Sequence, residues 1–250
     1  MLSIIYIIFM SLLAGILSGI VGMASLTLYP VLLSLGIPPI TANATITVAN
    51  SIGGFGSVVS SIKELNGHWK QAIQIALIST AGGVCGALIL IHSSNASFQK
   101  FVPIFILMAG IMILVPNKKT KTNEPKPKSK FVSTISWVGV LGVGMYSGYF
   151  GAGAGLLMIG VLSKVVHERY AVYNAFRNFA AAINNATAAV MFIFMLSIDW
   201  AVVLPLMFGL FVGNYIGPII VRFIPSKVIK LVVGCFALIL SAYLAYQAYF

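Results

Sequence analysis

Long apolar stretches make up most of the chain, and their lengths are those of helices that cross a lipid bilayer. A helix needs roughly 20 apolar residues to span the hydrocarbon core. Stretches close to that length cover about residues 41–62, 71–91, 99–115, 171–197, 200–221 and 228–249. The pattern therefore predicts an all-α polytopic membrane protein.

Two further regions, residues 2–36 and 131–166, are apolar but interrupted by small residues. The interruption is at 22–25 in the first region. In the second it is at 148–155, where the last five residues are all Gly or Ala. Because each Gly costs a helix about 1 kcal/mol, we expect the helix to stop at both breaks and to start again beyond them.

The basic residues indicate how these two regions meet the membrane. If each region crossed once, eight Lys and Arg residues would lie on the side of the central stretch 116–130 and six on the other side. If each were a hairpin that enters and leaves on one side, the count would be thirteen against one. Cytoplasmic loops carry the excess of positive charge, so the sequence favours two hairpins and a cytoplasmic stretch 116–130.

The chain also contains an internal repeat. Three glycines and one alanine recur at an offset of 129, and a tryptophan with two glycines recurs at an offset of 131. The matched positions are Gly15, Gly19, Gly22 and Ala42 with Gly144, Gly148, Gly151 and Ala171, and Trp69, Gly82 and Gly86 with Trp200, Gly213 and Gly217. A repeat of this kind in a strongly apolar chain is typical of secondary transporters.

The repeat and the hairpins together predict the domain organisation. We expect a first transmembrane repeat at 1–115, a cytoplasmic basic linker at 116–130 and a second transmembrane repeat at 131–250. Each repeat would be a broken or re-entrant hairpin plus three transmembrane helices. Three full crossings are an odd number, so the second repeat should be inverted and both termini should lie outside. Glycines at helical spacing away from the breaks, such as Gly82 and Gly86, are expected only to let helices pack closely.

The helix that follows each hairpin carries a polar stripe. The stripes are Asn43, Thr47, Asn50, Gly54 and Ser57 in the first half, and Asn174, Asn178, Ala181, Asn185 and Ala188 in the second. Polar side chains inside a span are costly unless they face a partner helix or a water-filled cavity. The stripes therefore indicate either hydrogen bonds between helices or a substrate path, and two matching stripes favour the path.

Arg177 is the one charge clearly inside a predicted span. An intramembrane Arg is by default a candidate functional residue, and here it would contact an anion. The alternative is that its guanidinium group reaches the nearby membrane interface, as long basic side chains do. No carboxylate falls inside a predicted span, which argues against a cation or metal site.

Composition agrees with a membrane protein and removes other classes. Hydrophobic residues make up 60% of the chain and charged residues 8%, and the mean hydropathy is +1.03. The net charge of +11 includes six lysines in 116–130 with no aromatic residues between them, so we expect no nucleic-acid partner. Cys85 and Cys235 are expected to be packing residues. The three histidines are scattered without metal-ligand or nucleophile spacing, so we expect no enzyme and no cofactor.

The breaks and stripes together predict an anion site. A helix that restarts inside the membrane offers unpaired N–H groups and a positive dipole end. The candidate substrate-binding residues are Gly22, Met23, Ser25, Asn50, Gly151, Gly153, Asn174, Arg177, Asn178 and Asn185. We expect the partners to be a small anion and the lipid bilayer, and alternating access to come from rocking of one half against the other. A transporter of amino acids or metal cations, a scaffold subunit and a homo-oligomer are left open.

Two motifs resemble a known family. The run Gly19-Ile20-Val21-Gly22 followed by Pro30, Gly36-Ile37-Pro38 and Ala42 is similar to the first signature of the sulfite exporter TauE/SafE family. The run 148–155 followed by Ala171 is similar to its second signature. The resemblance covers almost the whole chain. It implies a bacterial inner-membrane exporter of sulfite, of organosulfonates such as sulfoacetate, or of related small anions.

Overall fold

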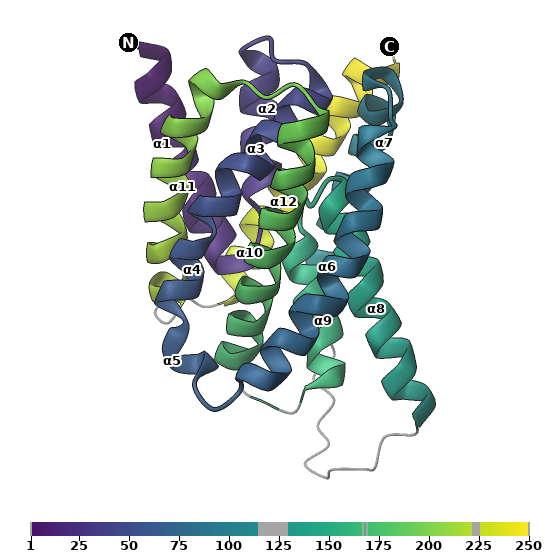
Figure 1. Ribbon diagram of the computed structural model, residues 1–250. Helices are drawn as coiled ribbons and strands as arrows, with labels where there is room; N and C mark the ends of the chain where they lie inside the picture. The colour runs from purple at the N-terminus through teal and green to yellow at the C-terminus, as the bar shows by residue number, and fades with distance from the viewer. Residues whose placement is uncertain (1, 115–129, 167, 169, 222–225, 250) are drawn as a thin grey trace.

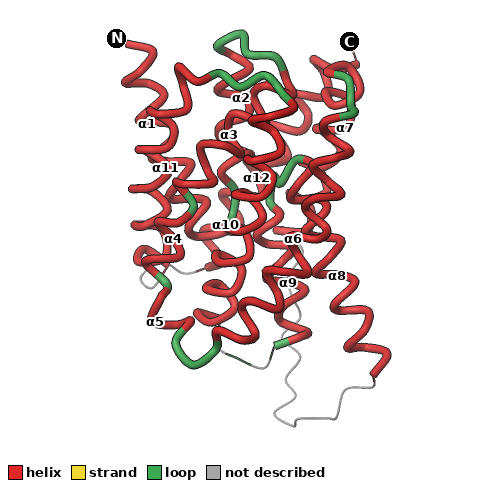
Figure 2. The backbone as a smooth tube through the Cα atoms, in the orientation of Figure 1, coloured by secondary structure: helices red, strands yellow, loops and turns green. Residues whose placement is uncertain are grey.

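The computed structural model describes residues 2–114, 130–166, 168, 170–221 and 226–249, and within them every regular element is a helix (Figures 1 and 2). The helices are α1 (Leu2–Val21), α2 (Ala24–Ser34), α3 (Pro39–Gly53), α4 (Phe55–Ser60), α5 (Ile62–Leu65), α6 (Trp69–Ile91), α7 (Asn95–Leu114), α8 (Lys130–Tyr149), α9 (Ala154–Val165), α10 (Tyr170–Met195), α11 (Trp200–Val221) and α12 (Ser226–Tyr249). The all-α polytopic prediction is confirmed.

Both glycine-rich breaks interrupt the backbone where the sequence predicts it. The first break separates α1 from the 11 residues of α2, and the second separates α8 from the 12 residues of α9. Gly22, Gly151 and Gly153 have φ angles of +77°, +75° and +73°. Residues with a Cβ rarely adopt this left-handed conformation, which is why glycine ends these helices.

The course of the chain can be followed in Figure 1. Both described ends of the chain lie at one end of the bundle, and the α5–α6 turn, the start of α8 and the end of α9 lie at the other. The two arms of each hairpin return toward the end from which they came, α1 with α2 and α8 with α9. An inverted symmetry between the halves stays a prediction. Residues 115–129, which include most of the expected linker, and the counted charges Arg169 and Arg222 lie outside the described residues.

One segment expected to form a single membrane-spanning helix is divided in the structure. Among the described residues, the helices long and apolar enough to cross a membrane are Trp69–Ile91, Ala171–Met195 and Trp200–Ile220. The single helix expected over 41–62 is wrong, because this segment forms α3, α4 and α5. At Ser61 the backbone N–H bonds to the carbonyl of Val58, three residues back, at 3.0 Å. This shift from the regular four-residue spacing tightens the turn and ends α4.

Two seams of glycine join the halves. A Cβ on Gly15 would lie 2.9 Å from the Cα of Gly213, which fixes α1 against α11. A Cβ on Gly82 or Gly86 would strike backbone carbonyls of α8. The expected packing role of these glycines is therefore confirmed. Each seam pairs the first hairpin arm of one half with a later helix of the other half.

Candidate functional site

The two breaks touch each other in the middle of the bundle. A Cβ on Gly22 would lie 2.6 Å from the Cα of Gly155 and would also strike the guanidinium group of Arg177. Residues from the first hairpin, the second hairpin and α10 therefore meet at one point. Only glycine fits at position 22, because its φ is positive and no space exists for a side chain.

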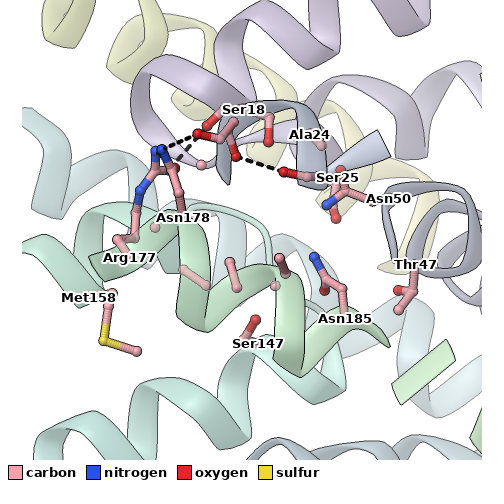
Figure 3. Close-up of a pocket in the computed structure, with 18 of the residues that line it drawn as sticks. Ser18, Ala24, Ser25, Thr47, Asn50, Ser147, Met158, Arg177, Asn178 and Asn185 are labelled. Carbon is pink, nitrogen blue, oxygen red and sulfur yellow. Dashed lines mark hydrogen bonds between the residues drawn. The ribbon is translucent and has the colours of Figure 1, made fainter. Parts of the chain in front are cut away.

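A cavity lies beside this contact (Figure 3). Its volume is about 60 Å³, which is room for a few waters or one small ion. One wall comes from α1, α2, α3, α4 and α11, and the other from α6, α8, α9, α10 and the second break. Its polar and charged lining side chains are Ser18, Ser25, Thr47, Asn50, Ser57, Ser79, Ser147, Arg177, Asn178, Asn185 and Asn214.

Two helices begin at the cavity. Ala24 and Ser25 in the first turn of α2, and Ala154 and Gly155 in the first turn of α9, line it. Neither helix has a side-chain hydrogen bond capping its first turn. The partial positive charge of a helix N-terminus favours an anion, and no carboxylate is among the lining residues.

Arg177 is buried at the end of α1, with 2% of its surface exposed. Its guanidinium group donates to the carbonyl oxygens of Ser18 and Gly19, both at 3.1 Å. It also donates to the side-chain oxygens of Asn174 at 2.8 Å and Asn178 at 2.6 Å. The alternative that Arg177 reaches the membrane interface is wrong, since the group stays inside and stabilises the negative C-terminal end of α1.

Arg177 also fixes how its two asparagine neighbours are oriented. A guanidinium group can only donate, so both amides must turn their oxygens toward it. The nitrogen of Asn178 then donates to Ser61 Oγ at 3.1 Å and joins α10 to the turn between α4 and α5. Of the two roles that the sequence left open for the polar stripes, Asn174 and Asn178 take part in hydrogen bonding within the protein. Asn178 also lines the cavity.

Asn185 and Asn50 lie on opposite walls of the cavity. Asn185 lines it from α10, and its side chain makes no hydrogen bond to another residue that the structure describes. Asn50 lines it from α3, and its oxygen accepts a hydrogen bond from Asn214 on α11 at 3.4 Å. Both amides are therefore available to a molecule in the cavity.

Seven of the ten candidate residues line the cavity together. They are Gly22, Ser25, Asn50, Gly151, Arg177, Asn178 and Asn185. Met23 is instead fully buried in the apolar core, Gly153 forms the N-cap of α9, and Asn174 lies behind Arg177. These three do not line the cavity.

Asn214 is the lining asparagine that the sequence analysis missed, and the lining serines Ser18, Ser79 and Ser147 were missed as well. Asn214 is a polar side chain in a strongly apolar span, next to Gly213 of the glycine seam. Both properties could have indicated it. No group of three or more His, Cys, Asp or Glu side chains that could hold a metal occurs in the described part of the chain.

A bundle of apolar helices with broken helices meeting at an internal polar cavity defines a membrane transporter. The family model for the sulfite exporter TauE/SafE matches residues 7–244, and the chain belongs to this family of transporters.

Named relatives agree with this class. A probable membrane transporter protein, ORF9 of Sinorhizobium sp, is 25% identical over 87% of this chain and 82% of its own. The probable membrane transporter protein YfcA of Escherichia coli strain K12 is 23% identical over 96% of this chain and 89% of its own. YunE of Bacillus subtilis strain 168, which has the same description, is 20% identical over the full length of both chains. No solved structure matches.

Proposed function

We propose that this protein transports small anions of the sulfite and organosulfonate kind across the bacterial inner membrane by alternating access. The observation that carries the proposal is the chemistry of the internal cavity. Two helix N-termini without side-chain caps and Arg177 lie at its wall, and no carboxylate is among its lining residues. Such a set of groups favours a negative charge over a positive one.

The anion would lie between the two breaks. Backbone N–H groups in the first turns of α2 and α9 would bind its oxygens, and Asn50 and Asn185 would donate from opposite walls. Arg177 would act mainly through its positive charge, because the four hydrogen bonds of its guanidinium group described above all go to protein oxygens. Asn178 would contribute by holding that guanidinium group in place.

The contacts between helices suggest which parts move. The first hairpin, α3 and α4 pack on α11, and the second hairpin packs on α6 and α10, while α3 and α4 also contact α10 across the cavity. We call α1, α2, α3, α4 and α11 the first body, and α6, α8, α9 and α10 the second body. Each body takes helices from both sequence halves, and the cavity lies between the bodies. Alternating access would then be a movement of these two bodies rather than of the sequence halves.

The two bodies are tied together on both sides of the cavity. On the side of the chain ends, Asn43 of α3 donates to the carbonyl oxygen of Tyr149 at 3.0 Å. On the opposite side, Asn178 donates to Ser61, and Arg177 bonds to the end of α1. Ties on both sides are consistent with an occluded state, and transport would open one set at a time.

The direction would follow from the membrane potential. With the basic linker in the cytoplasm, as the positive-inside rule predicts, the outside face would be the one that carries both chain ends. An inside-negative potential favours outward movement of an anion by about 2.3 kcal/mol per charge per 100 mV. Export would therefore need no proton relay.

Counterflow in proteoliposomes tests the proposal. Purified protein is reconstituted with unlabelled sulfite inside, and uptake of labelled sulfite, sulfoacetate or taurine is followed against protein-free liposomes. We expect exchange of sulfite or sulfoacetate, competed by other sulfonates and reduced in Arg177→Gln. Exchange of a cation or an amino acid with no effect of sulfonates would contradict the proposal.

A further inference from the structure

The orientation of Asn214 is set by a group that can only accept a hydrogen bond. Its side-chain nitrogen donates to the carbonyl oxygen of Leu210, one helical turn back, at 2.9 Å. A backbone carbonyl cannot donate, so the amide cannot be turned over without placing two oxygens against each other. Asn214 is only 1% exposed, so water cannot replace this partner freely.

The same nitrogen passes this orientation on to Asn50. Its second N–H points to the side-chain oxygen of Asn50 at 3.4 Å, at the long end of the range for such bonds. With its oxygen held toward α11, Asn50 must present its NH₂ group elsewhere, and Asn50 lines the cavity. The carbonyl oxygen of Leu210 on α11 thereby determines, through Asn214, that Asn50 on α3 presents its NH₂ group to the cavity.

We propose that Asn214 is a positioning residue for anion recognition: it acts through Asn50, whose NH₂ group it directs into the cavity. The inference rests on the proposed function and deepens it, because it assigns part of the preference for anions to an amide pair without charge. An Asn50 side chain free to turn would offer its oxygen to the cavity about as readily as its nitrogen, and an oxygen repels an anion.

The second body holds a matched asparagine that lacks this role. Asn184 of α10 is 2% exposed, and its nitrogen donates to the carbonyl oxygens of Gly144 at 3.2 Å and Ser79 at 3.5 Å. The repeat offset of 131 takes Asn214 to Gly83, and a Cβ there would strike the side chain of Asn184. Asn184 is thus similarly buried and also donates to backbone carbonyls, but it does not line the cavity.

The test is a double-mutant cycle on binding of sulfite to the full chain in lipid nanodiscs, with a melting temperature for every variant. Asn214→Ala is expected to weaken sulfite binding about twofold, because an Asn50 amide free to turn would present its NH₂ group to the cavity only about half of the time. In an Asn50→Ala background, where no amide remains to be directed, the same change should leave sulfite binding unchanged. Asn184→Ala should lower the melting temperature by a similar amount and leave sulfite binding unchanged.

The outcomes separate this inference from the proposed function. Unchanged sulfite binding in Asn214→Ala, or an equal loss in both backgrounds, overturns the positioning role, because a purely structural effect does not depend on Asn50. A loss of binding in Asn184→Ala as large as in Asn214→Ala overturns it as well. Failure of the unsubstituted protein to bind sulfite or sulfoacetate overturns the proposed function together with the inference.

Discussion

The two hairpins have the same kind of backbone break, but different side chains bind the carbonyl groups that each break exposes. In both, a helix ends inside the bundle at a left-handed glycine, and a shorter helix restarts at the cavity. The last carbonyls of α1 receive the guanidinium group of Arg177. The last carbonyl of α8 receives the neutral amide of Asn43.

This difference makes the cavity electrically asymmetric. A helix C-terminus carries a partial negative charge, and two of them end near a site proposed for an anion. At the first break, a full positive charge outweighs that partial negative charge. At the second break, an amide satisfies the carbonyl without changing the net charge. Two hairpins with the same kind of break can therefore carry different charges beside it.

The hairpins also differ in how much room surrounds their glycines. At Gly22 a Cβ would meet the second hairpin and Arg177, whereas at Gly151 the nearest atom is the Ser147 carbonyl oxygen at 3.1 Å, within its own hairpin. At the first break, a side chain is therefore excluded both by the positive φ of Gly22 and by close contact with the second body. At the second break, it is mainly the positive φ of Gly151 that favours glycine.

The largest effect is expected from locking the two bodies together. The native cysteines are first removed by Cys85→Ser and Cys235→Ser. A disulfide between Ser61→Cys and Asn178→Cys would then tie α10 to the α4–α5 turn, where Asn178 Nδ2 lies 3.1 Å from Ser61 Oγ. The reduced double-cysteine variant should already exchange sulfite more slowly than the unsubstituted protein, because it lacks Asn178 beside Arg177. We expect oxidation to abolish the remaining counterflow and reduction to restore it to that lowered rate. The measurement is sulfite exchange before and after reductant.

A matched disulfide within the second body provides the control. Gly83→Cys and Asn184→Cys would join α6 to α10, which belong to different sequence halves but to one body. Exchange should persist when this pair is oxidised. Loss of exchange would show that the sequence halves, and not the composite bodies, move against each other.

Arg177→Gln should have the next largest effect. It leaves the carbonyls at the end of α1 with fewer donors and removes a buried charge-assisted network, for which we expect a loss of about 3 kcal/mol in folding free energy. Sulfite affinity should also fall at least about tenfold, while the protein still folds. Binding isotherms and melting curves in nanodiscs measure the two effects separately. Unchanged affinity would remove Arg177 from the site, and Arg177→Lys should be intermediate because it keeps the charge without the planar fork.

Alanine at the two left-handed glycines should distinguish the breaks. Gly22→Ala combines an unfavourable φ with a clash against the opposite body, so we expect a loss of about 2 kcal/mol and impaired transport. Gly151→Ala carries mainly the cost of φ, about 1 kcal/mol. Thermal melting of both variants measures the difference. Equal losses would mean that the contact between Gly22 and Gly155 adds nothing.

The smallest effect is expected from Asn43→Ala. It leaves the Tyr149 carbonyl without its amide donor, which should cost about 1 kcal/mol of stability. Because no charge is removed, sulfite affinity should stay within about twofold of the unsubstituted protein. A loss of affinity comparable to that of Arg177→Gln would contradict the electrostatic asymmetry between the breaks.

The sequence by itself determined that the chain is a helical membrane protein and where its hairpins break. Both follow from local physics, because apolar length sets a membrane span and each glycine weakens a helix. The glycines of α6 and α11 stay helical because they pack against a neighbouring helix. Seven of the ten candidate residues chosen from the sequence line the cavity, because polar side chains within a membrane span must face the interior of the bundle.

Only the tertiary structure decided which polar side chains present a hydrogen-bond donor to the cavity and which form hydrogen bonds within the protein. Arg177 bonds to α1, 158 and 159 residues away in sequence, and Asn214 orients Asn50 across 164 residues. Spacing along one helix gives a face, but it does not give the helix that lies opposite. The role of a buried amide or guanidinium group depends on whether that opposite partner can donate, accept or do neither.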